Sequence, residues 1–307
     1  PQRINARYCQ RTRLAFTIFH RSPCVLIGID NYSFHRFLGE VRPGECQVVG
    51  SQWSWDLTID AALAAGADVV AFETCFMTLS DCREVLSRPL EIVTMLSWGH
   101  PFGLEYGASA VAEEDAQAWL RLAAELDHSR MRIVIAHPRL RDSSDGWHQA
   151  QKSVPSLARL AEEAIGLGIQ LCIENHADVT AEQLAWILEE VGSPSLGVCF
   201  DTANAVRVGD DPVEAVSTLA PWVSVVHVKD IASGPWHESS GPTSVPLGQG
   251  LIAVADVVSA IAHTTDDCWF LVELGHLGPH QADEAALVAS DIGWLRTQLS
   301  SPTPIRS

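Results

Sequence analysis

Residues 169–204 read IQLCIENHADVTAEQLAWILEEVGSPSLGVCFDTAN, and this stretch decides the fold. It contains two short apolar runs, at 169–174 and 196–201, that have no polar face. Such runs are typical of parallel strands that are covered on both sides. Between them, Thr180 and Gln183 form a capping-box pattern before apolar residues spaced i, i+3, i+4 and i+7, which indicates a helix. The stretch therefore predicts two parallel strands joined by a helix.

The same unit recurs through most of the chain. Eight apolar runs are expected to be strands, at 25–30, 68–73, 90–97, 132–137, 169–174, 196–201, 223–228 and 269–274. Further helices are expected near 54–65, 79–87, 112–127, 154–167, 254–263 and 281–299, and Asp211-Pro212 with Glu214 starts another. Eight strand and helix units without a break in composition predict a single-domain α/β protein, a closed (β/α)₈ or TIM barrel.

The length of the chain fits one such barrel. A TIM barrel needs roughly 250 residues plus insertions, and the chain has 307. We assign residues 24–300 to the barrel, 1–23 to an N-terminal extension that is expected to be poorly ordered, and 301–307 to a C-terminal tail. An open, doubly wound sheet is disfavoured because the first predicted strand is not followed by a Gly-x-Gly-x-x-Gly turn.

The charge balance restricts the partners. The chain holds 20 Lys and Arg against 38 Asp and Glu, a formal net charge of −18. Five of the Arg lie in residues 1–23, which contain no acid, so the remaining residues carry 15 basic and 38 acidic side chains. A surface this acidic repels nucleic acid and anionic membranes. We therefore expect no nucleic acid and no membrane as partners, and a small molecule as substrate.

The cysteines and the apolar runs indicate the compartment. Eight Cys are scattered without a Cys-x-x-Cys pair, which predicts reduced thiols rather than disulfides or a thiolate zinc site. The apolar runs are far shorter than the ~20 residues that a membrane-spanning helix needs. We therefore expect a cytoplasmic protein.

Four chemically active side chains lie at the ends of the last four predicted strands. Glu174, Asp201, His227 and Glu273 occupy equivalent positions in consecutive units, and the carboxyl ends of barrel strands surround the active-site mouth. Three carboxylates and one imidazole in one place repel one another unless a cation cancels the charge. Oxygen donors with a single imidazole suit Mn²⁺ first, with Mg²⁺ or Co²⁺ as alternatives. The sequence predicts one divalent metal ion held by these four residues.

Ordinary structural roles are open for each of these residues. An acid at a strand end can cap the helix that follows it, and His227 alone can be a core histidine with satisfied hydrogen bonds. Other side chains near the predicted mouth are candidates for contact with substrate. They are Lys229, for which an ion pair with Asp201 or Asp230 is the alternative, and His100, His137 and Trp98.

The segments ENH, FDTAN, HVKD and PLGQG together resemble the xylose-isomerase-like TIM-barrel superfamily of sugar isomerases and epimerases. The likeness covers roughly residues 25–300. In that family Glu, Asp, His and Glu from the last four strands bind one divalent metal, which by motif implies this role for Glu174, Asp201, His227 and Glu273. The motifs are specific for the superfamily and do not name a substrate.

The resemblance implies an enzyme that acts on a ketose or another sugar derivative. The metal stabilises an enediolate, and Glu174 and Glu273 are the implied acid and base, with His176 as a further proton carrier or an ordinary loop histidine. Return of the proton gives epimerisation or isomerisation. Gln249 in PLGQG stands where an acid is common in the family, so no acidic role is assigned there.

Other functions of the same superfamily stay open. A lyase would use the same stabilised enolate to remove carbon dioxide from a 3-oxo sugar acid or an aglycone from a 3-oxo glycoside. His137, His176 and the Trp-rich loops favour this reading, because a leaving group needs a proton donor and room. A C-glycoside deglycosidase would also bring a small second subunit, and homo-oligomers are common among such barrels. An apurinic-site endonuclease is disfavoured by the acidic composition.

Overall fold

The computed structural model describes residues 25–43, 45, 52–232, 242–277 and 283–300. Eight parallel strands close into a barrel in the spatial order β1, β2, β3, β4, β5, β6, β7, β10 and back to β1. Their bounds are β1 Leu26–Asp30, β2 Val69–Glu73, β3 Val93–Ser97, β4 Arg130–Val134, β5 Gln170–Glu174, β6 Leu196–Asp201, β7 Val223–Val228 and β10 Trp269–Val272. The predicted (β/α)₈ barrel is confirmed.

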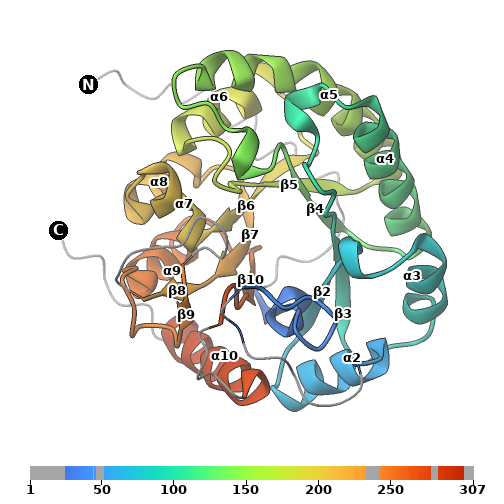
Figure 1. Cartoon of the computed structure of the whole chain (residues 1–307), viewed down its shortest axis with the longest axis vertical. Coiled ribbons are helices and arrows are strands. Elements are labelled where there is room, and N and C mark those ends of the chain that lie inside the picture. The colour runs from blue at the N-terminus through green and yellow to red at the C-terminus, as the bar shows by residue number, and fades with distance from the viewer. Residues whose placement is uncertain (1–24, 44, 46–51, 233–241, 278–282, 301–307) are drawn as a thin grey trace.

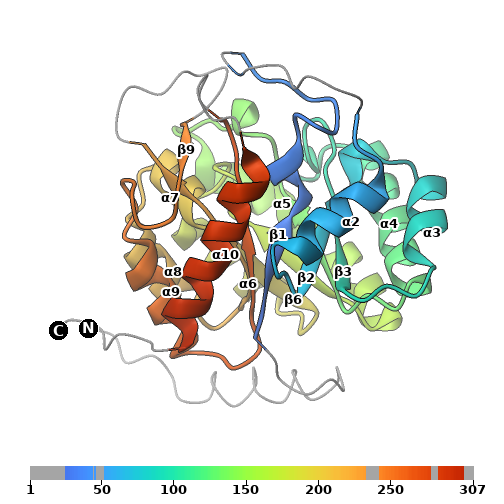
Figure 2. The ribbon, with the colours of Figure 1, turned by 90° about the horizontal axis from the view of Figure 1, so that it is seen from below.

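Helices surround the barrel on its outer face, as the view down the barrel shows (Figure 1). Their bounds are α2 Trp55–Ala64, α3 Leu79–Leu86, α4 Ala110–Glu125, α5 Gly146–Leu167, α6 Ala181–Val191, α7 Thr202–Val208, α8 Pro212–Leu219, α9 Val254–Ala262 and α10 Glu284–Ser300. The capping box predicted for α6 is present, because Thr180 and Gln183 each accept the other's backbone N–H. Helix α10 lies alongside β1 and completes the helical ring (Figure 2).

Two apolar layers explain why the strands are apolar on both faces. The larger layer lies between the strands and the helices. The smaller one fills the inside of the barrel with Val69, Ala71, Met95, Cys172, Cys199, Val225, Trp269 and Leu271. Such a filled interior leaves only the carboxyl ends of the strands to carry polar groups that face a ligand.

The fourth strand differs from its prediction. We expected it at 132–137, but it ends at Val134, so His137 lies three residues beyond the strand. Ile135 is fully buried, which explains the apolar signal, yet its carbonyl accepts the N–H of Tyr106 in the loop after β3 instead of pairing with a strand. An apolar pattern indicates that residues are buried, but it does not indicate which backbone group each residue hydrogen-bonds to.

Helix α5 and the late loop also differ from their predictions. Helix α5 begins at Gly146, well before the predicted start at 154, because Pro155 lies inside the helix and not in its first turn, where Pro is common. Residues 232–250 are rich in Gly, Pro and Ser and are expected from the sequence to be a long loop after the seventh strand, but this segment contains β9, Ser244–Val245, which pairs antiparallel with β8, Asp230–Ile231. The predicted extension 1–23, the predicted tail 301–307 and the loop segment 233–241 lie outside the described residues.

The PLGQG segment is a loop that a buried carboxylate holds in place. Asp230 accepts four backbone hydrogen bonds, from the N–H groups of Ile231, Gly248, Gly250 and Ile252. A Cβ atom at Gly250 would lie 2.2 Å from Asp230 Oδ1, so only glycine fits there. The motif therefore has a structural role, which agrees with the absence of an acid at Gln249.

Two further features concern the expected compartment. In the part of the chain that the structure describes, Cys75, Cys82, Cys172, Cys199 and Cys268 form no disulfides. Among the same residues, every helix is too short or too polar to cross a membrane.

A buried carboxyl group on α10 predicts a pH dependence of stability. Asp291 is 1% exposed, and burial raises its pKa to about 7 although the Leu247 N–H donates to its Oδ1. Because the folded-state pKa is above the unfolded value, this group stabilises the fold at low pH and that contribution is lost as pH rises from about 4 to 7.

Asp291→Asn keeps the acceptor for Leu247 and removes the buried charge. We expect its unfolding free energy to match that of the wild type near pH 4 and to exceed it at pH 8 by up to about 4 kcal/mol, the equivalent of three pKa units. Urea denaturation across this pH range measures the difference. Asp60→Asn, which removes an exposed carboxylate, should show no such trend; equal trends in both variants would contradict the prediction.

Candidate metal centre

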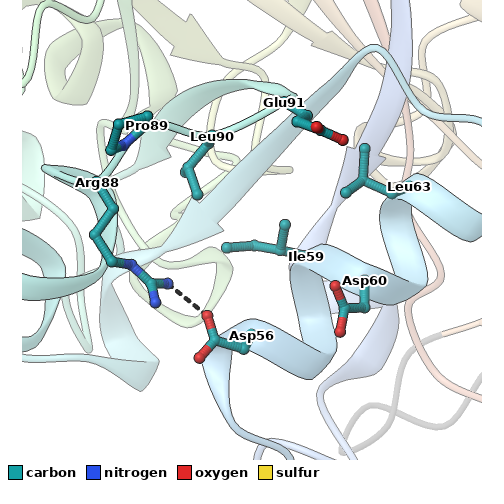
Figure 3. A pocket seen from close by; sticks show the side chains of 8 residues that line it. All are labelled: Asp56, Ile59, Asp60, Leu63, Arg88, Pro89, Leu90 and Glu91. Atoms are coloured by element: carbon teal, nitrogen blue, oxygen red, sulfur yellow. Dashed lines mark hydrogen bonds and ion pairs between the residues drawn. The ribbon is translucent and has the colours of Figure 1, made fainter.

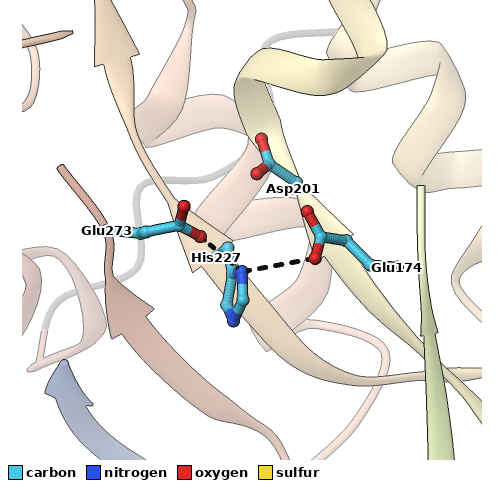
Figure 4. Close-up of side chains that lie close together, drawn as sticks. All are labelled: Glu174, Asp201, His227 and Glu273. Atoms are coloured by element: carbon cyan, nitrogen blue, oxygen red, sulfur yellow. Dashed lines mark ion pairs between the residues drawn. The ribbon is translucent and has the colours of Figure 1, made fainter. Parts of the chain in front are cut away.

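Four side chains from four neighbouring strands meet at the mouth of the barrel. Glu174 ends β5, Asp201 ends β6, His227 lies next to the end of β7, and Glu273 directly follows β10. One donor atom from each lies within 4.8 Å of the donor atoms of the other three, and all four residues are buried. Figure 4 shows Glu174 and Glu273 approaching His227 from two sides, with Asp201 beside them. The structure thus brings together all four predicted metal ligands.

Asp201 combines the two roles that the sequence left open. Its Oδ1 accepts the backbone N–H groups of Ala203 and Asn204 at 2.8 and 2.9 Å and so caps α7. Its Oδ2 does not take part in the cap and lies 2.7 Å from Lys229 Nζ. The helix cap fixes the carboxylate so that one oxygen remains directed at the cluster.

Glu174 is held by two neighbours of different charge. The amide of Asn204 donates to Glu174 Oε1 at 3.0 Å, and Arg132 Nε lies 2.9 Å from Glu174 Oε2. Arg132 is itself buried inside the barrel, where it also pairs with Glu73 and donates to the carbonyl of Trp98 at 2.9 Å. The sequence leaves Glu73, at the end of the second strand, either to orient the site or to pair with an arginine, and the structure shows the pairing.

Lys229 lies between two of the carboxylates. Its Nζ is 2.7 Å from Asp201 Oδ2 and 2.7 Å from Glu273 Oε1. The structural alternative, an ion pair with Asp201, is thus observed, whereas a contact between Lys229 and substrate stays a prediction. Burial opposes charge on Glu273, but Lys229 and His227 outweigh it and hold the pKa of Glu273 well below its usual range. Glu273 is therefore ionised at neutral pH.

The donor set fits a divalent cation. One oxygen each of Glu174, Asp201 and Glu273, and both ring nitrogens of His227, are buried and lack a hydrogen bond of good geometry among the described residues. The three oxygens have ion-pair contacts instead, with Arg132, Lys229 and His227. Burial raises the pKa of Asp201 even though Lys229 opposes the shift, and the charges of Glu273 and Glu174 add to it. A hard divalent ion suits these oxygen donors and would offset their charge.

The other predicted site residues lie in loops after β3, β4 and β5. The ring of His137 lies 6.4 Å from the ring of His176, and Phe102 lies 6.2 Å from His137. Trp98 stacks on His100 at 5.8 Å; it is fully buried and its indole N–H donates to Asp115. The indole thus supports His100, and contacts of these residues with substrate stay predictions.

The protonation of two of these histidines is set by their surroundings. Burial lowers the pKa of His176 to about 3, with nearby Arg132 and Arg207 adding to the shift. Burial and the cations Arg139 and Arg207 also lower the pKa of His137. Both rings are therefore neutral at neutral pH and can share hydrogen bonds, and the role of His176 as a proton carrier stays a prediction.

Three residues that contact the cluster were not predicted from the sequence. Arg132 and Asn204 hold Glu174, and Asp30, at the end of β1, lies 3.5 Å from His227. The sequence marks two of them as unusual. Arg132 is a charged residue in an apolar run, and Asp30 is an acid at the end of a predicted strand, like the predicted ligands. Asn204 is the last residue of the FDTAN motif, and nothing else in the sequence marks it as a contact of Glu174.

A second hollow lies outside the barrel and has different chemistry. It lies beside α2 and the segment before β3, where Arg88 pairs with Asp56 (Figure 3). Its other lining residues are Ile59, Asp60, Leu63, Pro89, Leu90 and Glu91. The four converging donors are not among them, so we place the site at the barrel mouth.

Comparison with protein families gives one match that spans most of the chain. The model described as Xylose isomerase-like TIM barrel matches residues 59–298. The 3-oxo-isoapionate decarboxylase of Pectobacterium atrosepticum is 25% identical over 199 residues, which is 64% of this chain and 70% of that protein. Other leading curated relatives match over less than half of their own length.

Solved structures share the fold at low sequence identity. An L-ribulose 3-epimerase superposes with a TM-score of 0.68 and 18% identity, covering 90% of this chain and 95% of that one. An IOLI protein with a bound zinc atom superposes with a TM-score of 0.67 and 14% identity, covering 91% of this chain and 99% of that one. At this identity the likeness shows the fold alone.

The buried arginine gives a test of the charge balance. Arg132→Met leaves the carboxylates of Glu73 and Glu174 buried without their cation, so we expect the unfolding free energy to fall by about 3–5 kcal/mol. Arg121→Met, which breaks an exposed pair with Glu163, should cost at most about 1 kcal/mol. Urea denaturation in the presence of a chelator measures both. Similar small losses in the two variants would contradict the prediction.

Proposed function

The chain belongs to the xylose isomerase-like TIM barrel family, and on this basis we propose that it is a divalent-metal-dependent sugar isomerase or epimerase. The observation that carries the proposal is the convergence of three carboxylates and one imidazole at the barrel mouth. An epimerase or isomerase of this kind needs two proton-transferring groups beside one cation. Glu174 and Glu273 flank His227 from two sides (Figure 4) and meet that need.

We assign the metal to Glu174, Asp201, His227 and Glu273. Three anionic oxygens and one imidazole nitrogen suit Mn²⁺, and Mg²⁺ or Co²⁺ would bind similar donors. The bound ion would polarise a carbonyl and an adjacent hydroxyl of the substrate and lower the pKa of the C–H bond between them.

The side chains around the site can carry out the proton transfer. Glu273 is ionised and can take the proton from the carbon, so that the C–H electrons form an enediolate. Glu174, on the other side of His227, would take up a proton from solvent and deliver it to the opposite face of that carbon, which inverts it, or to the neighbouring carbon, which moves the carbonyl. Exchange with solvent restores the two carboxyl groups.

Neighbouring residues keep these two carboxylates in place. Lys229 donates to Glu273 Oε1, and Asn204 donates to Glu174 Oε1, so each glutamate has one oxygen fixed and one directed at the cluster. Fixed donors and acceptors require little reorganisation during reaction, which is the main source of electrostatic catalysis. The rings of His100, His137 and His176 are assigned to hydrogen bonds with substrate hydroxyls.

A lyase is the second candidate, and the curated relatives favour it. The decarboxylase relative matches the chain over a longer stretch than the other leading relatives do, and four of the others are inosose dehydratases. The same enediolate or enolate chemistry would then end in loss of carbon dioxide or of a leaving group from a 3-oxo sugar. His137 and His176 beside the mouth are placed to assist a leaving group.

Metal binding tests the assignment of the ligands. Glu174→Gln, Asp201→Asn, His227→Asn and Glu273→Gln should each weaken Mn²⁺ binding by at least about tenfold, because loss of even an outer-shell partner commonly costs 10–100-fold. Isothermal titration of chelator-treated protein measures the affinity. Glu113 is a buried carboxylate on α4 that pairs with Arg159 on α5, so Glu113→Gln is the matched control and should bind Mn²⁺ normally. A wild type that binds no divalent ion refutes the proposal.

Isotope exchange and product analysis separate the two candidate reactions. The Mn²⁺-loaded protein is incubated in heavy water with free ketoses, 3-oxo sugar acids and 3-oxo glycosides. An epimerase or isomerase converts a ketose and incorporates deuterium next to the carbonyl, whereas a lyase releases carbon dioxide or an aglycone. Glu174→Gln and Glu273→Gln should lower either rate by about 10²–10⁴-fold, and Glu113→Gln should not. Full activity in the two glutamate variants would exclude the mechanism.

A further inference from the structure

A fifth carboxylate lies beside the proposed ligands. Asp30 ends β1, which is separated from β7 by β10, and its side chain is fully buried. Its Oδ2 lies 3.5 Å from His227 Nε2 and accepts a hydrogen bond from Ser97 Oγ at 2.7 Å. Its Oδ1 accepts the backbone N–H of Tyr32 at 2.8 Å. These bonds fix the carboxylate with one oxygen directed at His227.

The two ring nitrogens of His227 face different partners. Nδ1 lies 2.6 Å from Glu273 Oε2 and 3.9 Å from Glu174 Oε2, whereas Nε2 faces Asp30. A nitrogen that binds a metal must be free of its proton, and in a neutral ring the proton then sits on the other nitrogen. Since Nδ1 is the nitrogen beside the other donors, Nε2 has to carry the proton.

We propose that Asp30 is a positioning residue that accepts the Nε2–H of His227 and thereby keeps Nδ1 available to a divalent cation. The inference rests on the proposed metal site and adds to it a residue outside the four ligands. Both side chains are completely buried, so their electrostatic interaction is weakly screened at 3.5 Å. A carboxylate behind a metal-binding histidine fixes the ring and its protonated nitrogen.

One conservative substitution reverses this preference. In Asp30→Asn, the Tyr32 N–H requires an acceptor, which holds the amide oxygen at the Oδ1 position. The amide NH₂ then faces His227, and Nε2 must accept a hydrogen bond instead of donating one. The proton moves to Nδ1 and blocks the nitrogen that the metal needs. Asn is also a good N-cap, so the short helix after β1 is kept.

Nitrogen-15 NMR reads the protonated ring nitrogen directly. Long-range spectra are recorded on the metal-free protein at a pH high enough that the His227 ring carries a single proton, and the His227 signals are identified by their loss in His227→Gln. We expect Nε2 to be protonated in the wild type and unprotonated in Asp30→Asn. An Nε2 that stays protonated in Asp30→Asn overturns the inference.

Metal affinity supplies the second readout and its control. Asp30→Asn should weaken Mn²⁺ binding by about 10–100-fold in isothermal titration. Glu73 is a buried carboxylate near the same site, and it pairs with Arg132 and not with His227. Glu73→Gln therefore measures the effect of losing a nearby negative charge alone, and it should weaken Mn²⁺ binding by less than about fivefold. Equal losses in the two variants contradict a role for Asp30 through His227.

Two further outcomes are distinguishable. If Asp30→Asn fails to fold, as judged by circular dichroism, Asp30→Ala carries the same comparison with Glu73→Gln; it removes the acceptor and should also bind at least about tenfold more weakly. If the wild type binds no divalent ion, both the proposed function and this inference fail. If the wild type binds Mn²⁺ and the Asp30 variants bind it equally well, only the inference about Asp30 fails.

Discussion

The excess of buried negative charge at the barrel mouth is the constraint on which the site depends. Asp30, Glu73, Glu174, Asp201 and Glu273 lie close together, and the permanent cations that contact them among the described residues are Arg132 and Lys229. Buried carboxylates are stable only when they are paired, protonated or bound to a metal. The two cations leave an excess that a divalent ion would reduce, so the charge balance and the donor geometry favour the same ligand.

The fold fixes these carboxylates through backbone groups as well as through charges. Asp201 caps α7 and Asp30 caps the short helix after β1. In each case one carboxylate oxygen accepts backbone N–H groups of the helix, and the other oxygen points toward the cluster at the barrel mouth. Asn175 joins the ends of β5 and β6 by exchanging hydrogen bonds with the backbone of Asp201. Ligand positions are therefore set by the strand ends and depend little on the long loops.

The barrel and the four converging side chains were predictable from the sequence, because both follow from a repeated pattern. Apolar runs report buried strands, and equivalent positions in successive units must lie on one edge of the barrel. The end of β4 was not predictable, since Ile135 is buried but its backbone pairs with a loop. The contacts of Arg132 with Glu174 and of Asp30 with His227 were not predictable, because the two residues of each pair are distant in the sequence.

The arrangement divides the mouth into two halves with different tasks. The four donors come from β5, β6, β7 and β10, whereas His100 and His137 come from loops after β3 and β4. Chemistry common to isomerases, epimerases and lyases requires only the first half, because each begins by stabilising charge next to a carbonyl. We propose that the choice of substrate and product depends on the second half. Asp30 connects the two, because its Oδ2 lies 3.5 Å from His227 Nε2 and accepts a hydrogen bond from Ser97 at the end of β3.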